Sequence, residues 1–449
     1  MEWPWALPFA GILLSIALGP SIAPKFWHAH YGKIAFGWAA LTLAALALFQ
    51  GGPIALATFV HVILTEYASF IILLFALYVV AGGILITGTV RATPCINAAA
   101  LAFGTAAASL VGTTGAALIL IRPLVRANRA RAHNVHVIVF FIILVANVGG
   151  ALTPLGDPPL LVGFLHGVAF PWPVQHLWLQ TLIVAVPLLA IFLALDFWHF
   201  RREAGGQDDP SQVDPSAEPL RVRGLINLAL LAGIVAAVLG SAAIKPGIII
   251  DFYGSRLELQ NLLRDGMLIV IVLLSLWLTP DEHRAANDFS WEPIREVGIL
   301  FAGIFIAIAP VMAMLEAGRA GAFAFLLQAV TAHDGSPHEA AYFWLTGILS
   351  AFLDNAPTYL AFFELAGGDA ETMMDPLAGT LASICMGAVY MGGLTYIGNA
   401  PNLMTQSIAR EAGIRMPNFF GYMLWAGAVL LPLFVLLTLL PISPLLNLR

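Results

Sequence analysis

Charged residues are scarce in this chain of 449 amino acids: 10% are Asp, Glu, Lys or Arg, while 60% are hydrophobic. A soluble globular protein carries about 25% charged residues, so this chain cannot cover a single core with a polar surface. We therefore expect its main solvent to be lipid. The apolar runs are continuous rather than alternating, which predicts an all-α membrane protein and argues against a β-barrel.

Cysteine and the common catalytic motifs are also nearly or wholly missing. Cys95 and Cys385 each lie in or beside an apolar segment, which is typical of packing residues rather than of a disulfide or metal pair. The sequence has no Walker phosphate loop, nucleophile-elbow serine, Cys-x-x-Cys or His-Glu-x-x-His. We expect no enzyme, no cofactor and, without a basic patch, no nucleic-acid partner.

Ten apolar segments fit the length of about 20 residues that a membrane helix needs. They are 5–20, 32–50, 64–88, 134–168, 176–198, 224–243, 264–280, 297–317, 378–410 and 417–441, with 134–168 and 378–410 interrupted. The stretch 51–63 is marked by Gly and Pro and has no assignment.

Two further segments, 97–121 and 339–370, are apolar but broken midway. The breaks are Gly112-Thr113-Thr114-Gly115 and Asp354-Asn355-Ala356-Pro357-Thr358. Each arm is too short to span the membrane, which predicts a re-entrant hairpin whose bare backbone is covered by protein or water.

Basic residues test this layout. If the N-terminus is outside and both hairpins re-enter, fifteen of the 20 Lys and Arg residues lie in cytoplasmic loops, as the positive-inside rule requires. The hairpins then enter from opposite faces. The polar stretch 199–223 becomes a cytoplasmic linker between two inverted repeats, 1–198 and 224–449.

Internal similarity supports the repeats. The run Gly149–Leu160 resembles Gly392–Asn402, so that Thr153 aligns with Thr395 and Gly156 with Gly398, an offset of 242 positions. The same offset superimposes the two hairpin breaks. Paired broken helices in the two halves of a chain are typical of a transporter's binding site.

The paired breaks supply oxygen ligands that suit Na⁺. They come from the interrupted spans as Thr153, Gly156, Asp157, Thr395, Gly398 and Asn399, and from the hairpin tips as Thr113, Thr114, Asp354, Asn355 and Thr358. We expect the metal ligands for Na⁺ to be Asp354, Asn355, Asp157 and Asn399. Asn147, one turn before Gly150, either lines the site or bonds a neighbouring helix.

Asp354 is the sharpest single candidate, because a carboxylate at membrane depth is costly and marks function. A group that binds either a proton or Na⁺ can exchange one for the other. The structural alternative is that Asp354 caps the helix beginning near Pro357. The two roles are compatible.

Ser350–Thr358, Gly149–Pro159 and Gly393–Asn402 resemble the ion transporter superfamily, and within it the NhaD-type Na⁺/H⁺ antiporters and the related citrate transporter family. The resemblance covers nearly the whole chain. It implies two inverted repeats of five spans plus a hairpin, a homodimer, and a transport part that holds both hairpins and both interrupted spans and moves like an elevator.

The first tip departs from the antiporters by having no carboxylate, and both tips lack the Ser-Asn-Thr of dicarboxylate symporters. Our main hypothesis is a multi-pass sodium:proton antiporter of the bacterial inner membrane, with Na⁺ and H⁺ as transported ions. The alternative is Na⁺- or H⁺-coupled transport of citrate or a dicarboxylate, with a small carboxylate as substrate. A channel or non-transporting receptor is a third reading.

Overall fold

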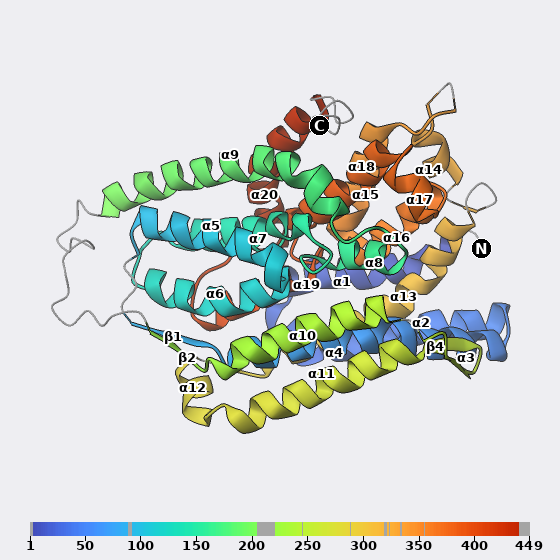
Figure 1. Cartoon of the computed structure of the whole chain (residues 1–449), viewed down its shortest axis with the longest axis horizontal. Coiled ribbons are helices and arrows are strands. Elements are labelled where there is room, and N and C mark those ends of the chain that lie inside the picture. The colour runs from blue at the N-terminus through green and yellow to red at the C-terminus, as the bar shows by residue number, and fades with distance from the viewer. Residues whose placement is uncertain are drawn as a thin grey trace. The chain divides into compact units, whose positions relative to one another are not determined.

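The computed structural model describes residues 3–88, 92–203, 221–244, 246–287, 289–317, 321–322, 324–332, 335–353 and 355–439. Its regular structure is almost entirely helical (Figure 1). Within these residues, eight helices are long and apolar enough to cross a membrane. The expected class, an all-α polytopic membrane protein, is confirmed.

Seven of the eight long helices lie on expected spans: Pro24–Phe49, Gly52–Gly82, Val135–Leu152, Trp172–Glu203, Leu259–Leu278, Ile294–Met314 and Phe419–Leu439. The eighth, Pro94–Val111, is the first arm of the expected hairpin 97–121. The expectation that each arm is too short to span was wrong for this arm, because its helix begins three residues earlier, at Pro94, and reaches 18 residues. Shorter apolar helices, Trp3–Ile16, Ile226–Ser241 and Ala378–Leu394, lie on three more expected spans. The unassigned stretch 51–63 is helical and runs on through a π-helical turn, Val62–Tyr67, into the next helix.

The chain forms two compact units, and each draws on both halves of the sequence. The first unit comprises Met1–Val79, Ala232–Leu274 and Ser290–Ser336. Its elements are η1 (Trp3–Ala6), α1 (Leu7–Ile22), α2 (Pro24–Phe49), α3 (Gly52–His61), η2 (Val62–Tyr67), most of α4 (Ala68–Gly82), α10 (Ile226–Ala243) and α11 (Leu259–Leu278), the hairpin of β3 (Ile249–Phe252) and β4 (Ser255–Glu258), α13 (Glu292–Glu316) and α14 (Ala324–Ala329).

In the first unit, α2 packs on α1 and α13. The Tyr67 hydroxyl donates to the Gly298 carbonyl over 2.9 Å. The Phe70 ring stacks on Phe301 with centroids 5.1 Å apart. These contacts tie the π-helical turn and the start of α4 to α13.

The second unit comprises Val80–Leu231, Ser275–Phe289 and Pro337–Arg449. Its elements are β1 (Leu85–Thr87) paired with β2 (Arg221–Arg223), α5 (Pro94–Val111), α6 (Thr113–Asn128), α7 (Val135–Leu144), η3 (Val148–Leu152), α8 (Pro158–Leu165), α9 (Trp172–Glu203), α12 (Asp281–Ala286), α15 (Glu339–Leu353), α16 (Asn355–Leu365), α17 (Ala370–Met374), α18 (Ala378–Met391), η5 (Gly392–Leu394), α19 (Ala400–Glu411) and α20 (Phe419–Leu439).

The second unit therefore contains both expected hairpins and both interrupted spans, the grouping that the resemblance implies for a transport part. The expected division into 1–198, 199–223 and 224–449 cuts the chain into consecutive segments. The two observed units instead each combine segments from both halves of the chain. Within the expected linker, α9 continues to Glu203 and β2 pairs with β1. Residues 204–220 lie outside the described part of the chain.

Candidate functional site

The first hairpin tip is held against the first helix break. The two arms, α5 and α6, pack side by side (Figure 1) and meet at Gly112. Gly112 has φ +84°, which favours glycine. A Cβ there would lie 3.2 Å from the Leu155 carbonyl oxygen. Directly after this turn, the Thr113 amide donates to the Gly156 carbonyl over 2.7 Å. The tip and the break thus form one site.

The first break is a turn between η3 and α8, in which the Gly156 amide donates to the Thr153 carbonyl over 2.9 Å. Thr153 and Asp157 have extended backbone, and Asp157 stands at the N-cap of α8, before Pro158. Proline suits the first helical turn because its missing N–H would have no helical acceptor there. Gly156 packs so closely on Gly150 that a Cβ would come within 2.1 Å of the Gly150 carbonyl oxygen.

The second break repeats this design. Thr395 and Asn399 are extended, and Asn399 stands at the N-cap of α19, with Pro401 in the first turn. A Cβ on Gly398 would lie 2.5 Å from the Gly392 carbonyl oxygen. Glycine is required at the closest approach of each break because any side chain would collide with backbone.

The carboxylate of Asp157 is the centre of the site. Thr113 Oγ1 donates to its Oδ1 over 2.8 Å, and Asn399 Nδ2 donates to the same oxygen over 3.0 Å. Asn355 Nδ2 donates to its Oδ2. All four side chains are at most 1% exposed. One carboxylate therefore connects both hairpin helices, α6 and α16, with both breaks.

Each residue of this centre lies at the N-terminal end of a helix. Thr113 and Asn355 begin α6 and α16, and Asp157 and Asn399 precede α8 and α19. Helix N-termini carry partial positive charge and stabilise anions. The four helix ends therefore suit an anionic group, such as a carboxylate.

Two oxygen atoms beside Asp157 have no hydrogen-bond partner within the described part of the chain. They are Asn355 Oδ1 and Asn399 Oδ1, and both are buried. A buried acceptor without a partner costs about 1 to 3 kcal/mol, so a bound ligand that satisfies these oxygens is favoured. A hard cation prefers carboxylate and amide oxygens. The residues present therefore fit Na⁺.

Asn147 lies behind this centre and satisfies backbone freed by the first break. Its Nδ2 donates to the Ile142 carbonyl over 2.8 Å and to Asn402 Oδ1 over 2.7 Å. Asn402 Nδ2 in turn donates to the carbonyls of Gly392 and Thr395. Asn147 Oδ1 also accepts from Asn399 Nδ2 over 3.4 Å. Asn147 therefore bonds a neighbouring helix and also contacts a residue of the centre.

The other expected site residues shape the breaks. Thr153 Oγ1 donates to the Ser109 carbonyl, and Thr395 Oγ1 donates to the Ala351 carbonyl. The Thr114 and Thr358 side chains are buried in the first turns of α6 and α16. The helix of the second tip begins at Asn355, two residues before the expected Pro357. Asp354 lies outside the described residues.

Sequence reasoning missed Ser109 and Asn402. Ser109 Oγ donates to the Gly149 carbonyl and accepts the Leu152 amide over 3.2 Å. Both side chains form hydrogen bonds that hold irregular backbone against a helix. The signal for Asn402 was present, because it directly follows the repeated Gly398-Asn399-Ala400-Pro401 motif. Ser109 is a small residue in a helix rich in small residues and carries no such signal.

Residues 1–442 match the family described as "Putative citrate transport". Proteins named uncharacterized transporter from Mycobacterium tuberculosis and Mycobacterium bovis are each 28% identical over 278 residues, 60% of this chain and 59% of theirs. A protein named 46 kDa membrane protein from Mycobacterium leprae is 25% identical over a stretch of the same length. The match thus spans 59% of the length of these relatives. The chain belongs to the family described above and is a multi-pass membrane protein.

Proposed function

We propose that this protein is a secondary active sodium:proton antiporter, in which the Asp157 centre binds either Na⁺ or a proton. The observation that carries the proposal is the pair of buried amide oxygens, Asn355 Oδ1 and Asn399 Oδ1, that have no hydrogen-bond partner in the described residues and flank one buried carboxylate. Together with that carboxylate they make an oxygen-lined position for a hard cation.

Exchange follows from the hydrogen bonds of Asp157. The ionised carboxylate accepts from Thr113, Asn355 and Asn399. A proton turns one carboxylate oxygen into a donor and removes the charge that attracts Na⁺. Proton and Na⁺ therefore bind in competition, as antiport requires.

Transport needs this centre to face each side of the membrane in turn. The second unit contains both hairpins, both breaks and every residue of the centre. We propose that it moves as one transport part, in the elevator manner that the resemblance implies, in a homodimer of the bacterial inner membrane. Asp354, predicted from the sequence, supplies a second carboxylate to the ion path.

Coupled uptake of a small carboxylate such as citrate is the second candidate. The family description names citrate, and four helix N-termini converge on Asp157. Helix N-termini are common sites for carboxylate groups. In this case the Asp157 centre would hold the coupling cation, and the positive N-terminal ends of these helices would receive the substrate.

Proteoliposomes with an internal pH indicator separate these functions. Antiport predicts that an external Na⁺ pulse makes the interior more alkaline without any carboxylate, and that a K⁺ pulse does not. Coupled uptake predicts a response only when citrate or succinate is added with Na⁺ or with a proton gradient. A protein that passes Na⁺ down its gradient without moving protons or a carboxylate would be a channel, which would overturn both candidates.

Variants link either activity to the site. Asp157→Asn should reduce coupled transport to the level of empty liposomes, because it removes the titratable charge. The matched control is Asp375→Asn, the same change at an exposed position in the same unit. Asp354→Asn should also abolish coupling if ion exchange is its role, but should cost little if it only caps a helix, since Asn caps about as well as Asp.

A further inference from the structure

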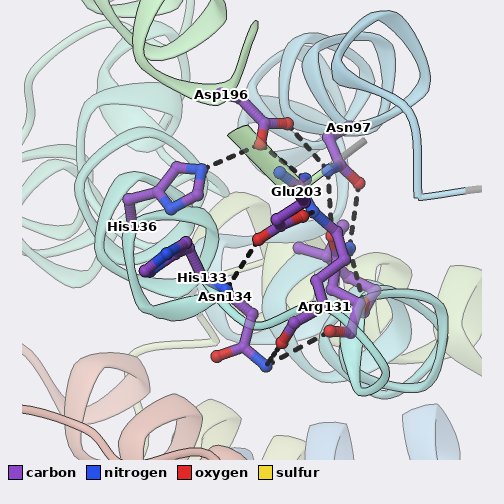
Figure 2. A network of polar contacts seen from close by, with 9 residues as sticks. Asn97, Arg131, His133, Asn134, His136, Asp196 and Glu203 are labelled. Atoms are coloured by element: carbon purple, nitrogen blue, oxygen red, sulfur yellow. Dashed lines mark hydrogen bonds and ion pairs between the residues drawn. The ribbon is translucent and has the colours of Figure 1, made fainter. Parts of the chain in front are cut away.

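A second group of charged and titratable side chains, three of them buried, lies in the second unit. It consists of Arg131, His133, His136, Asp196, His199 and Glu203, here called the histidine cluster. Arg131 and His133 lie in the loop between α6 and α7, His136 is in the first turn of α7, and the other three lie in the last turns of α9. Figure 2 shows Asp196 facing His136 and Asn97.

The cluster clamps the loop and α5 to α9. Asp196 is fully buried; it accepts from Arg131 Nη1 and from Asn97 Nδ2 over 2.9 Å. Arg131 Nε donates to Glu203 Oε2 over 3.0 Å. The His133 amide donates to the other oxygen of Glu203 over 2.8 Å. Breaking one member of a buried ion pair is costly, about 3 to 5 kcal/mol, so this clamp is strong while its charges are balanced.

Three imidazole rings lie in this cluster, and proton binding to them changes its net charge. The His136 Nε2 atom lies 2.9 Å from Asp196 Oδ1. The His199 ring centroid is 4.8 Å from that of His136 and 4.7 Å from that of His133. With neutral histidines, two carboxylates and one guanidinium leave one net negative charge. One added proton neutralises the cluster. Further protons add like charges next to Arg131, and these repel one another.

Proton binding fits this cluster better than metal binding. Over the described ranges, no group of three or more His, Cys, Asp or Glu side chains is arranged to hold a metal ion. Histidine is the side chain whose charge changes between about pH 5 and 8. His133 is exposed, so protons reach the cluster from water. The 32-residue helix α9 is about 48 Å long, longer than the membrane core of about 30 Å, so its last turns reach the membrane boundary.

We propose that the histidine cluster is a pH-operated clamp, on the side that the Lys and Arg distribution predicts to be cytoplasmic. At neutral and alkaline pH the clamp is closed. On acidification, protonation of His199 adds positive charge beside Arg131 and opens the clamp. The clamp secures the base of the first hairpin through Asn97 and the start of α7 through His136. The hairpin leads to Thr113 and α7 leads to Asn147, so opening lowers the rate of transport.

The transport test is Na⁺ flux into proteoliposomes with equal pH on both sides, from pH 5.5 to 8.5. Saturating Na⁺ removes simple competition with protons at Asp157. The rate should fall on acidification, and His199→Phe should shift this fall to more acid pH while leaving the rate at pH 8.5 unchanged. The matched control is His176→Phe, because His176 also lies on α9 and stacks on an aromatic ring, Trp172, with centroids 4.3 Å apart. An identical shift in the control, or no shift in His199→Phe, would overturn the proposal.

A second test does not depend on transport and separates this proposal from the antiport function. Hydrogen–deuterium exchange of residues 128–136 is measured in detergent at pH 8 and 6 and corrected for the intrinsic effect of pH on exchange. Protection should be lost at pH 6 in the parent and retained in His199→Phe. His199→Gln serves if the aromatic variant does not fold. Equal protection of the parent at both pH values would show that no clamp opens, whatever the ion transported.

Discussion

The two interrupted helices can be compared residue by residue, because positions 242 apart in the sequence take the same backbone roles. Thr153 and Thr395 each donate to a carbonyl 44 residues earlier, on α5 and α15 respectively. Gly156 and Gly398 each pack closely against the carbonyl of a glycine six residues earlier. At the helix caps the two breaks differ, because Asp157 occupies the position of Asn399. These two side chains are themselves in contact, with Asn399 Nδ2 3.0 Å from Asp157 Oδ1.

This difference indicates how a repeated frame yields a single charged centre. Two carboxylates at the equivalent caps would lie within hydrogen-bond distance and repel each other. An amide at one cap instead donates to the carboxylate at the other, and its own oxygen has no hydrogen-bond partner among the described residues. The repeated frame supplies the geometry, and the difference at the cap position supplies the charge.

The first prediction concerns the direction from which each hairpin enters the membrane. The two hairpins should enter from opposite faces. Arg129 and Glu371 are 242 positions apart, and both are exposed. Arg129→Cys should react with a membrane-impermeant thiol reagent only from the cytoplasmic side and Glu371→Cys only from the other side. Cys95, which is exposed, is replaced by Ser, whereas Cys385 is buried and stays. Labelling of both from one side would contradict the inverted repeat.

Asn399→Asp should have the largest energetic effect, because it places a second carboxylate against Asp157. An uncompensated buried charge costs about 3 to 5 kcal/mol, so the unfolding midpoint in detergent should fall steeply without Na⁺. Added Na⁺ should recover part of the loss, since a ligand that binds the folded state stabilises it. The control is the exchanged pair, Asp157→Asn with Asn399→Asp, which restores a single charge and should be close to the parent in stability.

Much of this frame could be predicted from the sequence, because its signals are local. Gly and Pro inside apolar runs marked the tips and breaks, and the repeated Thr153 and Gly156 pattern set the register. The side-chain partners could not be predicted in the same way. The contact between Asp157 and Asn355 joins residues 198 positions apart, and only the fold brings them together.

Two features could not be assigned from the sequence, for simple physical reasons. The stretch 51–63 had no assignment because it is marked by Gly and Pro, but Gly52 and Pro53 lie in the first turn of α3, where proline is well tolerated. The histidine cluster was missed because Arg131 and Asp196 are 65 positions apart. Each residue alone resembles an ordinary loop or interfacial charge. No periodicity in the sequence links them.

Alanine at the closest glycine of each break should cost less than the charge change. A Cβ at Gly156 would lie 2.1 Å from the Gly150 carbonyl oxygen, and one at Gly398 would lie 2.5 Å from the Gly392 oxygen. Overpacking of this kind costs about 1 to 3 kcal/mol, and Gly156→Ala should be the more damaging. Gly240→Ala is the control, since its Cβ meets nothing within 4 Å. Thermal unfolding in detergent ranks the three, and a harmless Gly156→Ala would refute the close packing.

The smallest difference should separate Thr153→Val from Thr395→Val, one chemical change made at equivalent positions. Thr153 Oγ1 donates to the Ser109 carbonyl and accepts the Leu155 amide over 3.2 Å. Thr395 Oγ1 donates to the Ala351 carbonyl and accepts two amides, those of Ile397 and Gly398.

Valine keeps the shape but leaves these backbone groups without the hydroxyl, at about 1 to 3 kcal/mol for each buried group. Thr395 is fully buried, whereas Thr153 is half-buried and water can replace part of its bonding. Thr395→Val should therefore lower the unfolding midpoint more than Thr153→Val, with Ser in place of either Thr close to the parent. Equal losses at the two positions would mean that the breaks depend on their hydroxyls to the same extent. The difference between the halves would then be confined to Asp157 and Asn399.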